Sequence, residues 1–106
     1  MLRNVILIIA LAVAATTAAA QSAQPQPAQS VVMYATAWCP YCAKARAYFA
    51  RTGAAYTEYD IEKSADARAE FKRLGGRGVP LILVGREKMN GFSEQGFEHL
   101  LVRAAR

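Results

Sequence analysis

The chain has 106 residues and a formal net charge of +5, a length that allows no more than one small domain. Its lysines and arginines are scattered among acidic residues, as in Glu70-Phe71-Lys72-Arg73. Because the sequence has no basic block and no interleaving of basic with aromatic residues, it argues against a nucleic-acid-binding surface. The positive charge is expected mainly to keep the protein soluble.

Residues 1–20 have the layout of a secretory signal peptide. Arg3 precedes an unbroken apolar run from Val5 to Ala15, and Ala18-Ala19-Ala20 offers small residues for cleavage ahead of Gln21. The run is shorter than the roughly 20 apolar residues that span a bilayer. We therefore expect cleavage near Ala20 and a periplasmic or otherwise exported protein, with retention of the segment as a membrane anchor as the alternative.

Residues 21–30 are rich in Gln, Ala and Pro and contain no large apolar side chain. This composition predicts a disordered linker. The folded domain is then expected over residues 31–106, which is small but within the range that folds alone.

The domain sequence predicts four strands and three helices, because apolar runs alternate with segments of helical periodicity. In chain order these are a strand Val31–Ala35, a helix Pro40–Thr52 ending at Gly53, a strand Ala55–Tyr59, a helix from Ser64 to about Leu74, a strand Leu81–Val84, a strand Lys88–Asn90, and a helix beginning at Ser93. The helix between the first two strands predicts a parallel pair, and the short turn at Gly85 predicts an antiparallel hairpin. The expected fold class is α/β, with a four-stranded mixed sheet covered by helices on both faces.

The last predicted helix carries an apolar stripe of Phe97, Leu100 and Leu101. His99 lies beside this stripe. We interpret His99 as a surface or boundary residue, without a catalytic role.

The only two cysteines, Cys39 and Cys42, lie between the first predicted strand and the first predicted helix. Cys39 is expected at the helix N-cap or just before it, with Pro40 at the first helical position, where a missing N–H is no loss. Free N–H groups and the positive end of the helix dipole favour the Cys39 thiolate. Cys42 lies nearly one turn further on, close enough to attack a mixed disulfide formed on Cys39.

Other uses of a C-x-x-C motif fit less well. Structural zinc normally takes four ligands, and apart from the cysteines the chain offers only the distant His99. A disulfide across so short a loop is a poor structural staple. A Cu(I) carrier or a subunit bridging an iron-sulfur cluster stays open as the alternative, since thiolates are soft ligands, and a substrate-binding domain with little turnover is a further possibility.

The motif Cys39-Pro40-Tyr41-Cys42, a Val79-Pro80 step about 40 residues later and the order of elements together resemble the glutaredoxin branch of the thioredoxin-like fold. The resemblance covers residues 31–102. It implies that Cys39 is the attacking thiol and Cys42 the resolving thiol, with Tyr41 flanking the substrate. It also implies a cis peptide bond before Pro80, which would let the Val79 backbone pair with an extended substrate.

The same resemblance implies a glutathione site. Arg77 matches a basic residue that helps to hold the glycine carboxylate, and Gly91 belongs to a turn whose N–H groups receive the other end of the tripeptide, with Phe92 and Ser93 following. Two positions depart from the family pattern, because Thr36 replaces the usual lysine and Gly78 the usual threonine. The turn beginning at Gly91 also looks like that of glutaredoxin-like thioredoxins, which take electrons from a reductase protein.

The sequence thus predicts an exported glutaredoxin-type thiol-disulfide oxidoreductase that uses a dithiol mechanism on protein or glutathione mixed disulfides. No bound metal or organic cofactor is expected, and glutathione would be a cosubstrate. Glutathione or a reductase protein would supply electrons. We expect no nucleic-acid partner and a monomer.

Overall fold

The computed structural model describes residues 30–106. The predicted signal peptide and all of the predicted linker except Ser30 lie outside this range. Within the described residues, no helix combines the length and the hydropathy that a bilayer crossing requires.

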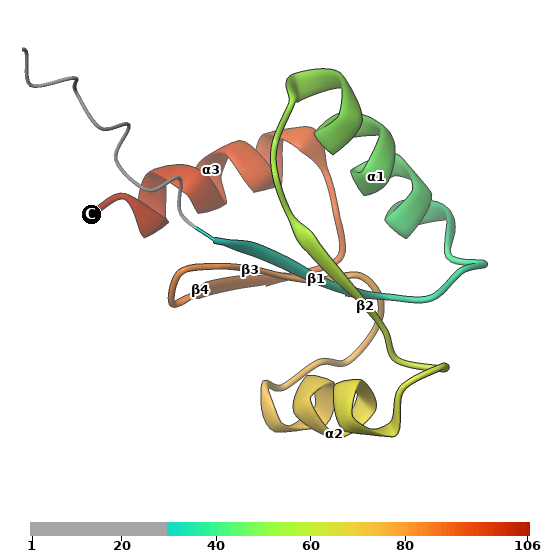
Figure 1. Cartoon of the computed structure of the whole chain (residues 1–106). Helices are drawn as coiled ribbons and strands as arrows, with labels where there is room; N and C mark the ends of the chain where they lie inside the picture. Colours follow the sequence, from blue (N-terminus) through green and yellow to red (C-terminus); the bar gives the residue numbers. More distant parts are fainter. Residues whose placement is uncertain (1–29) are drawn as a thin grey trace, which may run out of the picture.

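The described chain forms a mixed sheet with three helices, as the sequence predicts (Figure 1). The elements are β1 (Val31–Ala35), α1 (Pro40–Thr52), β2 (Thr57–Asp60), α2 (Ala65–Arg73), β3 (Leu81–Val84), β4 (Glu87–Asn90) and α3 (Glu94–Ala104). The strand order is β2-β1-β3-β4. β1 pairs parallel to β2, whereas β3 is antiparallel to both β1 and β4, so the predicted fold class is confirmed.

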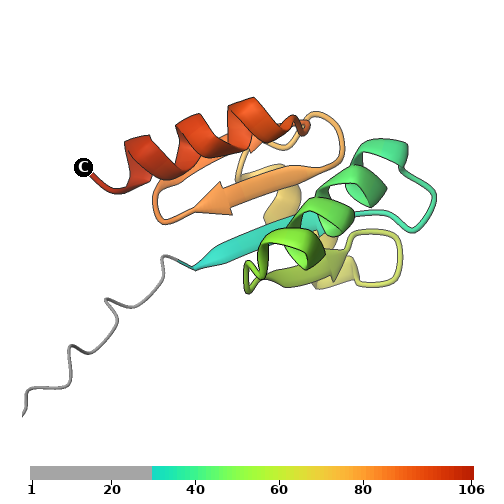
Figure 2. The ribbon, with the colours of Figure 1, turned by 90° about the horizontal axis from the view of Figure 1, so that it is seen from above.

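Helices cover both faces of the sheet. Figures 1 and 2 show α1 and α3 on one face and α2 on the other. On the first face, Phe49 of α1 packs against Phe97 of α3 with 5.1 Å between ring centroids. On the second face, Phe71 of α2 is buried with Tyr34 and Leu81. The hydrophobic core is therefore divided by the sheet into two clusters, and the larger one fixes α1 relative to the strands.

Local sequence signals set the helix ends. Ser64 and Ser93 are the N-caps of α2 and α3, and their hydroxyls accept hydrogen bonds from Ala67 N and Gly96 N. These bonds satisfy N–H groups that have no partner within the helix. At the end of α1, Gly53 adopts a left-handed conformation with φ of 71°, which glycine tolerates without steric penalty.

Three details of the sequence prediction were wrong. Leu101 is 38% exposed, although Phe97 and Leu100 are buried as expected. It follows Leu100 directly, and one residue turns a helix by about 100°, which carries Leu101 off the inner face. The strand predicted at Ala55–Tyr59 begins and ends later as β2, and β4 begins one residue earlier than predicted, at Glu87. His99 is exposed, as predicted.

Candidate active site

Cys39 is the N-cap of α1, and Pro40 is the first helical residue, as the sequence predicts. The Cys39 backbone is extended, with φ of −72° and ψ of 119°. Its Sγ accepts a hydrogen bond from Cys42 N at 3.2 Å. An N–H group fixed at a helix start is already aimed at the sulfur, so negative charge forming there meets a donor and the positive end of the helix dipole.

Cys42 lies behind Cys39 and is fully buried, whereas Cys39 keeps 4% of its surface exposed. Both are free cysteines. Burial, together with a hydrogen bond to Cys39, raises the pKa of the Cys42 thiol to about 12. The Thr36 backbone and the charge of Arg46 act in the opposite direction on the pKa of Cys42. At neutral pH Cys42 is therefore protonated.

A loop from a distant part of the chain lies against the Cys39 sulfur. The Val79-Pro80 peptide bond is cis, and the Cys39 thiol donates to the Val79 carbonyl oxygen at 3.5 Å. Pro80 is fully buried, and its carbonyl accepts a hydrogen bond from Gly91 N at 2.7 Å. Of the predicted contact residues, Val79 therefore contacts Cys39 directly, and Gly91 is hydrogen-bonded to the adjacent Pro80.

Two exposed aromatic side chains stand at the motif. Trp38 is 67% exposed and Tyr41 54% exposed. The Trp38 Nε1 donates to Glu62 Oε1 at 2.7 Å, and Lys44 Nζ lies 5.0 Å from the centre of the Tyr41 ring. Exposed aromatic rings of this kind favour contact with a partner molecule. Sequence reasoning did not assign Trp38 a role, although its position immediately before Cys39 was a usable signal.

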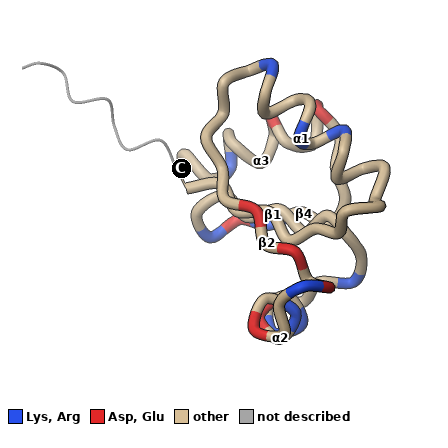
Figure 3. Tube along the Cα trace, turned by 45° about the vertical axis from the view of Figure 1, so that its right-hand side comes forward, with Lys and Arg blue, Asp and Glu red and all other residues tan. Residues whose placement is uncertain are grey.

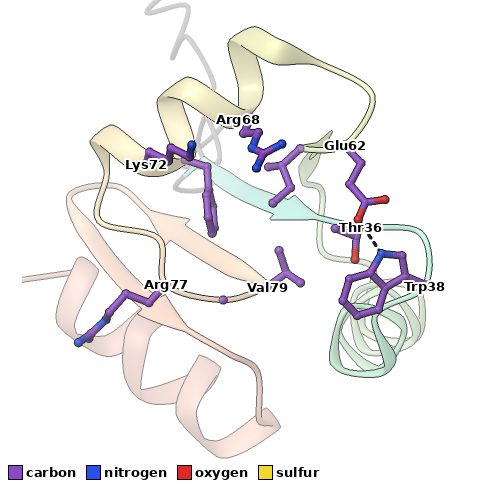
Figure 4. A pocket seen from close by; sticks show the side chains of 10 residues that line it. Thr36, Trp38, Glu62, Arg68, Lys72, Arg77 and Val79 are labelled. Carbon is purple, nitrogen blue, oxygen red and sulfur yellow. Dashed lines mark hydrogen bonds between the residues drawn. The ribbon is translucent and has the colours of Figure 1, made fainter.

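A pocket of about 280 Å³ lies between the motif and α2. Trp38 and Glu62 form one wall, α2 contributes Arg68 and Lys72, and Val79 lies opposite (Figure 4). Arg77 also lines this pocket, but Figure 4 shows its side chain extending away from Arg68 and Trp38. Sequence reasoning missed Arg68 and Lys72, whose spacing of four residues on one helix puts them on the same face.

A second pocket of about 370 Å³ brings together three predicted contact residues, Tyr41, Phe92 and Ser93. It shares no lining residue with the first pocket. Phe92 also packs on Tyr48, with 5.7 Å between ring centroids, and the Ser93 hydroxyl is engaged in capping α3. The predicted binding residues therefore fall into two separate groups, one containing Val79 and Arg77 and the other containing Tyr41, Phe92 and Ser93.

Thr36 and Arg46 lie beside the cysteines. Thr36 Oγ1 is buried without a hydrogen-bond partner among the described residues. Thr36 is the residue that replaces the lysine of the glutaredoxin pattern noted in the sequence. Arg46 Nη2 donates to the Thr36 carbonyl at 3.0 Å, and the same guanidinium pairs with Glu58 of β2. Sequence reasoning missed Arg46, because its partners belong to other elements.

The charges elsewhere are mixed. Figure 3 shows lysines and arginines interspersed with acidic residues along the trace. In the part of the chain that the structure describes, no group of three or more His, Cys, Asp or Glu side chains is arranged to hold a metal ion. The chemistry that the described site offers is that of two thiols.

The fold and the site together define a thiol-disulfide oxidoreductase of thioredoxin-like fold. The sheet is mixed, one cysteine is the N-cap of a helix with the second buried behind it, and a cis-proline loop lies against the first sulfur. The glutaredoxin family model matches residues 31–89. The chain therefore belongs to the glutaredoxin family, and the resemblance seen in the sequence is confirmed.

Relatives agree with this placement. A glutaredoxin from Pseudomonas aeruginosa is 36% identical over 77 residues, which is 72% of this chain and 88% of the relative. The solution structure of a glutaredoxin from Brucella melitensis is 30% identical, covers 77% of this chain and 97% of its own, and superposes with a TM-score of 0.56. A buckwheat glutaredoxin-glutathione complex, at 23% identity, shares the fold with a TM-score of 0.56 and covers 72% of this chain and 76% of its own.

Proposed function

We propose that this glutaredoxin acts outside the cytoplasm on protein disulfides and glutathione mixed disulfides, with Cys39 as nucleophile and Cys42 as resolving thiol. The Cys39 thiolate attacks one sulfur of the substrate disulfide, so a Cys39-substrate disulfide forms and the other sulfur leaves as a thiolate that takes a proton from solvent. Cys42 then loses its proton and attacks Cys39 Sγ. The substrate leaves reduced, and a two-electron donor reduces the resulting Cys39-Cys42 disulfide.

The observation that carries this proposal is the unequal placement of the two thiols. Cys39 Sγ accepts the Cys42 N–H at the helix start and keeps some exposure, whereas Cys42 is fully buried with a raised pKa. Because the thiolate is the reactive form, the raised pKa and burial of Cys42 make it a poor first nucleophile. Cys39 has an N–H donor aimed at its sulfur. Cys42 becomes useful only after its neighbour has formed the mixed disulfide.

The surroundings of Cys39 support a peptide-like substrate. The Val79 backbone lies against the sulfur, where an extended chain could pair with it. Arg68 and Lys72 place positive charge at the first pocket, which suits a carboxylate such as that of glutathione. We propose glutathione as cosubstrate and electron donor, with a reductase protein as the alternative donor. We also propose that the protein acts as a monomer.

We expect the Cys39-Cys42 pair to show a reduction potential of about −200 to −230 mV, the range of glutaredoxins. The measurement is equilibration of the reduced protein with a glutathione redox buffer, followed by acid trapping and mass spectrometry. In the same series, Cys42→Ser should accumulate one glutathione on Cys39, because the thiol that would displace it is gone.

A potential far above this range with no adduct on Cys42→Ser would favour an oxidant over a glutathione-coupled reductase. A potential far below it with no adduct would favour a reductase protein as donor. Failure of the wild-type protein to form the intramolecular disulfide would contradict the dithiol mechanism itself, and metal analysis of anaerobically purified protein would then test Cu(I) or iron-sulfur binding.

Export is supported by the apolar run Val5–Ala15 and the small residues that end at Ala20. When the full chain is expressed in a Gram-negative host, we expect the periplasmic fraction to contain a protein whose N-terminal residue is Gln21. N-terminal sequencing makes the measurement. An intact N-terminus in the membrane fraction would indicate a retained anchor, and an intact N-terminus in the cytoplasm would contradict export.

A further inference from the structure

Arg46 is held by three hydrogen bonds one helical turn beyond Cys42. Its Nε donates to Glu58 Oε1 at 2.8 Å and its Nη2 to Glu58 Oε2 at 2.9 Å. The same Nη2 donates to the Thr36 carbonyl at 3.0 Å. A bidentate pair with an added backbone contact fixes the direction of a guanidinium group more firmly than a single contact does. The side chains of Arg46 and Glu58 are each 29% exposed, so water only partly screens their charge.

The position of Arg46 matters because of its spacing from Cys42. The two residues are four apart on α1 and therefore lie on the same face of the helix. The groups that act on the Cys42 thiol are Cys39, the Thr36 backbone and Arg46. The groups that act on Arg46 are Glu58, Tyr56 and Cys42 through their charge, and the Thr36 carbonyl through a hydrogen bond. Arg46 is thus the cation of the described structure that favours the ionised form of Cys42.

The resolving step needs such a cation. Cys42 is fully buried, and a buried thiolate without compensating charge is disfavoured by desolvation. The attack on Cys39 nevertheless requires the thiolate, so the Cys42 proton must leave to solvent before or during the formation of the new S–S bond. The fixed positive charge lowers the free energy of this ionised state without any movement of the side chain.

We propose that Arg46 is a positioning residue for the resolving step, in which its cation, held by Glu58 and the Thr36 carbonyl, stabilises the Cys42 thiolate as it attacks the mixed disulfide. The inference rests on the proposed function, in which Cys42 is the resolving thiol. Arg46 lines neither of the two pockets described at the motif. It acts through Cys42 and through Thr36, whose backbone also favours the Cys42 thiolate.

The test separates the two steps by mixing the reduced protein with excess dithiobis-nitrobenzoate, an aromatic disulfide that releases a coloured thiolate. Attack by Cys39 releases the first equivalent and leaves the second aromatic thiol bound to Cys39. Attack by Cys42 then forms the Cys39-Cys42 disulfide and releases the second equivalent. We expect Arg46→Gln to slow the second phase about threefold or more near neutral pH and to move its pH profile upward. The first phase should stay within about twofold of wild type, because the groups that contact the Cys39 sulfur are the Val79 carbonyl and Cys42 N.

Matched variants separate charge from structure. Glu58→Gln breaks the same ion pair but keeps the cation, which still has the Thr36 carbonyl as a partner. Because the Glu58 carboxylate offsets part of the charge of Arg46, the second phase of Glu58→Gln should be no slower than that of wild type, and its pH profile should not move upward. Arg46→Lys should restore most of the lost rate, because it keeps a positive charge on a long side chain. Arg103→Gln removes a surface pair with Glu87 in the last turn of α3 and should leave both phases unchanged. If Arg46→Gln does not fold, Arg46→Met takes its place, since it keeps an apolar stem of similar length.

Equal slowing in Arg46→Gln and Glu58→Gln would overturn the inference, because the ion pair would then act only as a structural brace. A wild-type second phase and pH profile in Arg46→Gln would overturn it as well. Release of a single equivalent by the wild-type protein would instead contradict the proposed function, so the two failures are distinguishable.

Discussion

Cys39→Ser should lower the turnover of disulfide substrates about a thousandfold or more, because the hydroxyl that replaces the thiol is not ionised at neutral pH and no base is in place to activate it. Cys42 is a poor substitute. It is fully buried, and its raised pKa keeps it in the thiol form. The measurement is the steady-state reduction of a glutathione mixed disulfide coupled to consumption of NADPH through glutathione reductase.

The matched control is Cys42→Ser, which alters the same motif with the same chemical change. It should retain the first attack on a disulfide and lose only the intramolecular resolution. If Cys39→Ser kept substantial activity while Cys42→Ser lost it, the roles of the two cysteines would have to be exchanged. Circular dichroism of both variants checks that the strand-turn-helix segment is intact.

Phe49→Ala should destabilise the domain by about 3 to 5 kcal/mol, the usual effect of removing a buried aromatic ring. Phe49 is 1% exposed. Its ring centroid lies 4.6 Å from that of Tyr56, 5.1 Å from that of Phe97 and 6.2 Å from that of Phe92. Alanine would leave a cavity where α1, α3 and the sheet meet. Because small domains are stable by only about 5 to 15 kcal/mol, a large part of the stability would be lost.

Urea unfolding followed by circular dichroism measures this change. Leu101→Ala is the control, since Leu101 is exposed on α3 and its truncation should change the free energy of unfolding by less than about 0.5 kcal/mol. A loss below about 1 kcal/mol for Phe49→Ala would show that the core closes around the cavity. The position of α1, and with it that of Cys39, would then depend less on this cluster than we infer.

Contacts between the core and the second pocket link stability to activity. Phe92 lines that pocket and also packs on Tyr48 and Phe49 of α1. The loop before α3 is therefore held by the same aromatic cluster that holds the helix carrying the cysteines. Loss of this packing is expected to disturb substrate contacts as well as folding.

The amino-acid sequence by itself determined the local structure. The helix starts at Cys39, Ser64 and Ser93 and the helix end at Gly53 were predicted correctly. Each depends on interactions among residues a few positions apart, such as a side-chain oxygen with an N–H three residues later. The placement of the two thiols at one helix start was predictable for the same reason, because both belong to one short motif. The periodicity of apolar residues was sufficient to predict the element types and the fold class.

Only the tertiary structure decided which groups surround those thiols. The Val79 carbonyl that contacts Cys39 is 40 residues away in the sequence, and Trp38 and Glu62 are 24 apart. Arg46 meets Thr36 and Glu58 only because α1 packs across the ends of β1 and β2. Sequence periodicity says which face of a helix is apolar, but it does not say which side chain from another element lies opposite. The pocket beside Arg68 and the charge beside Cys42 therefore follow from how the helices pack on the sheet.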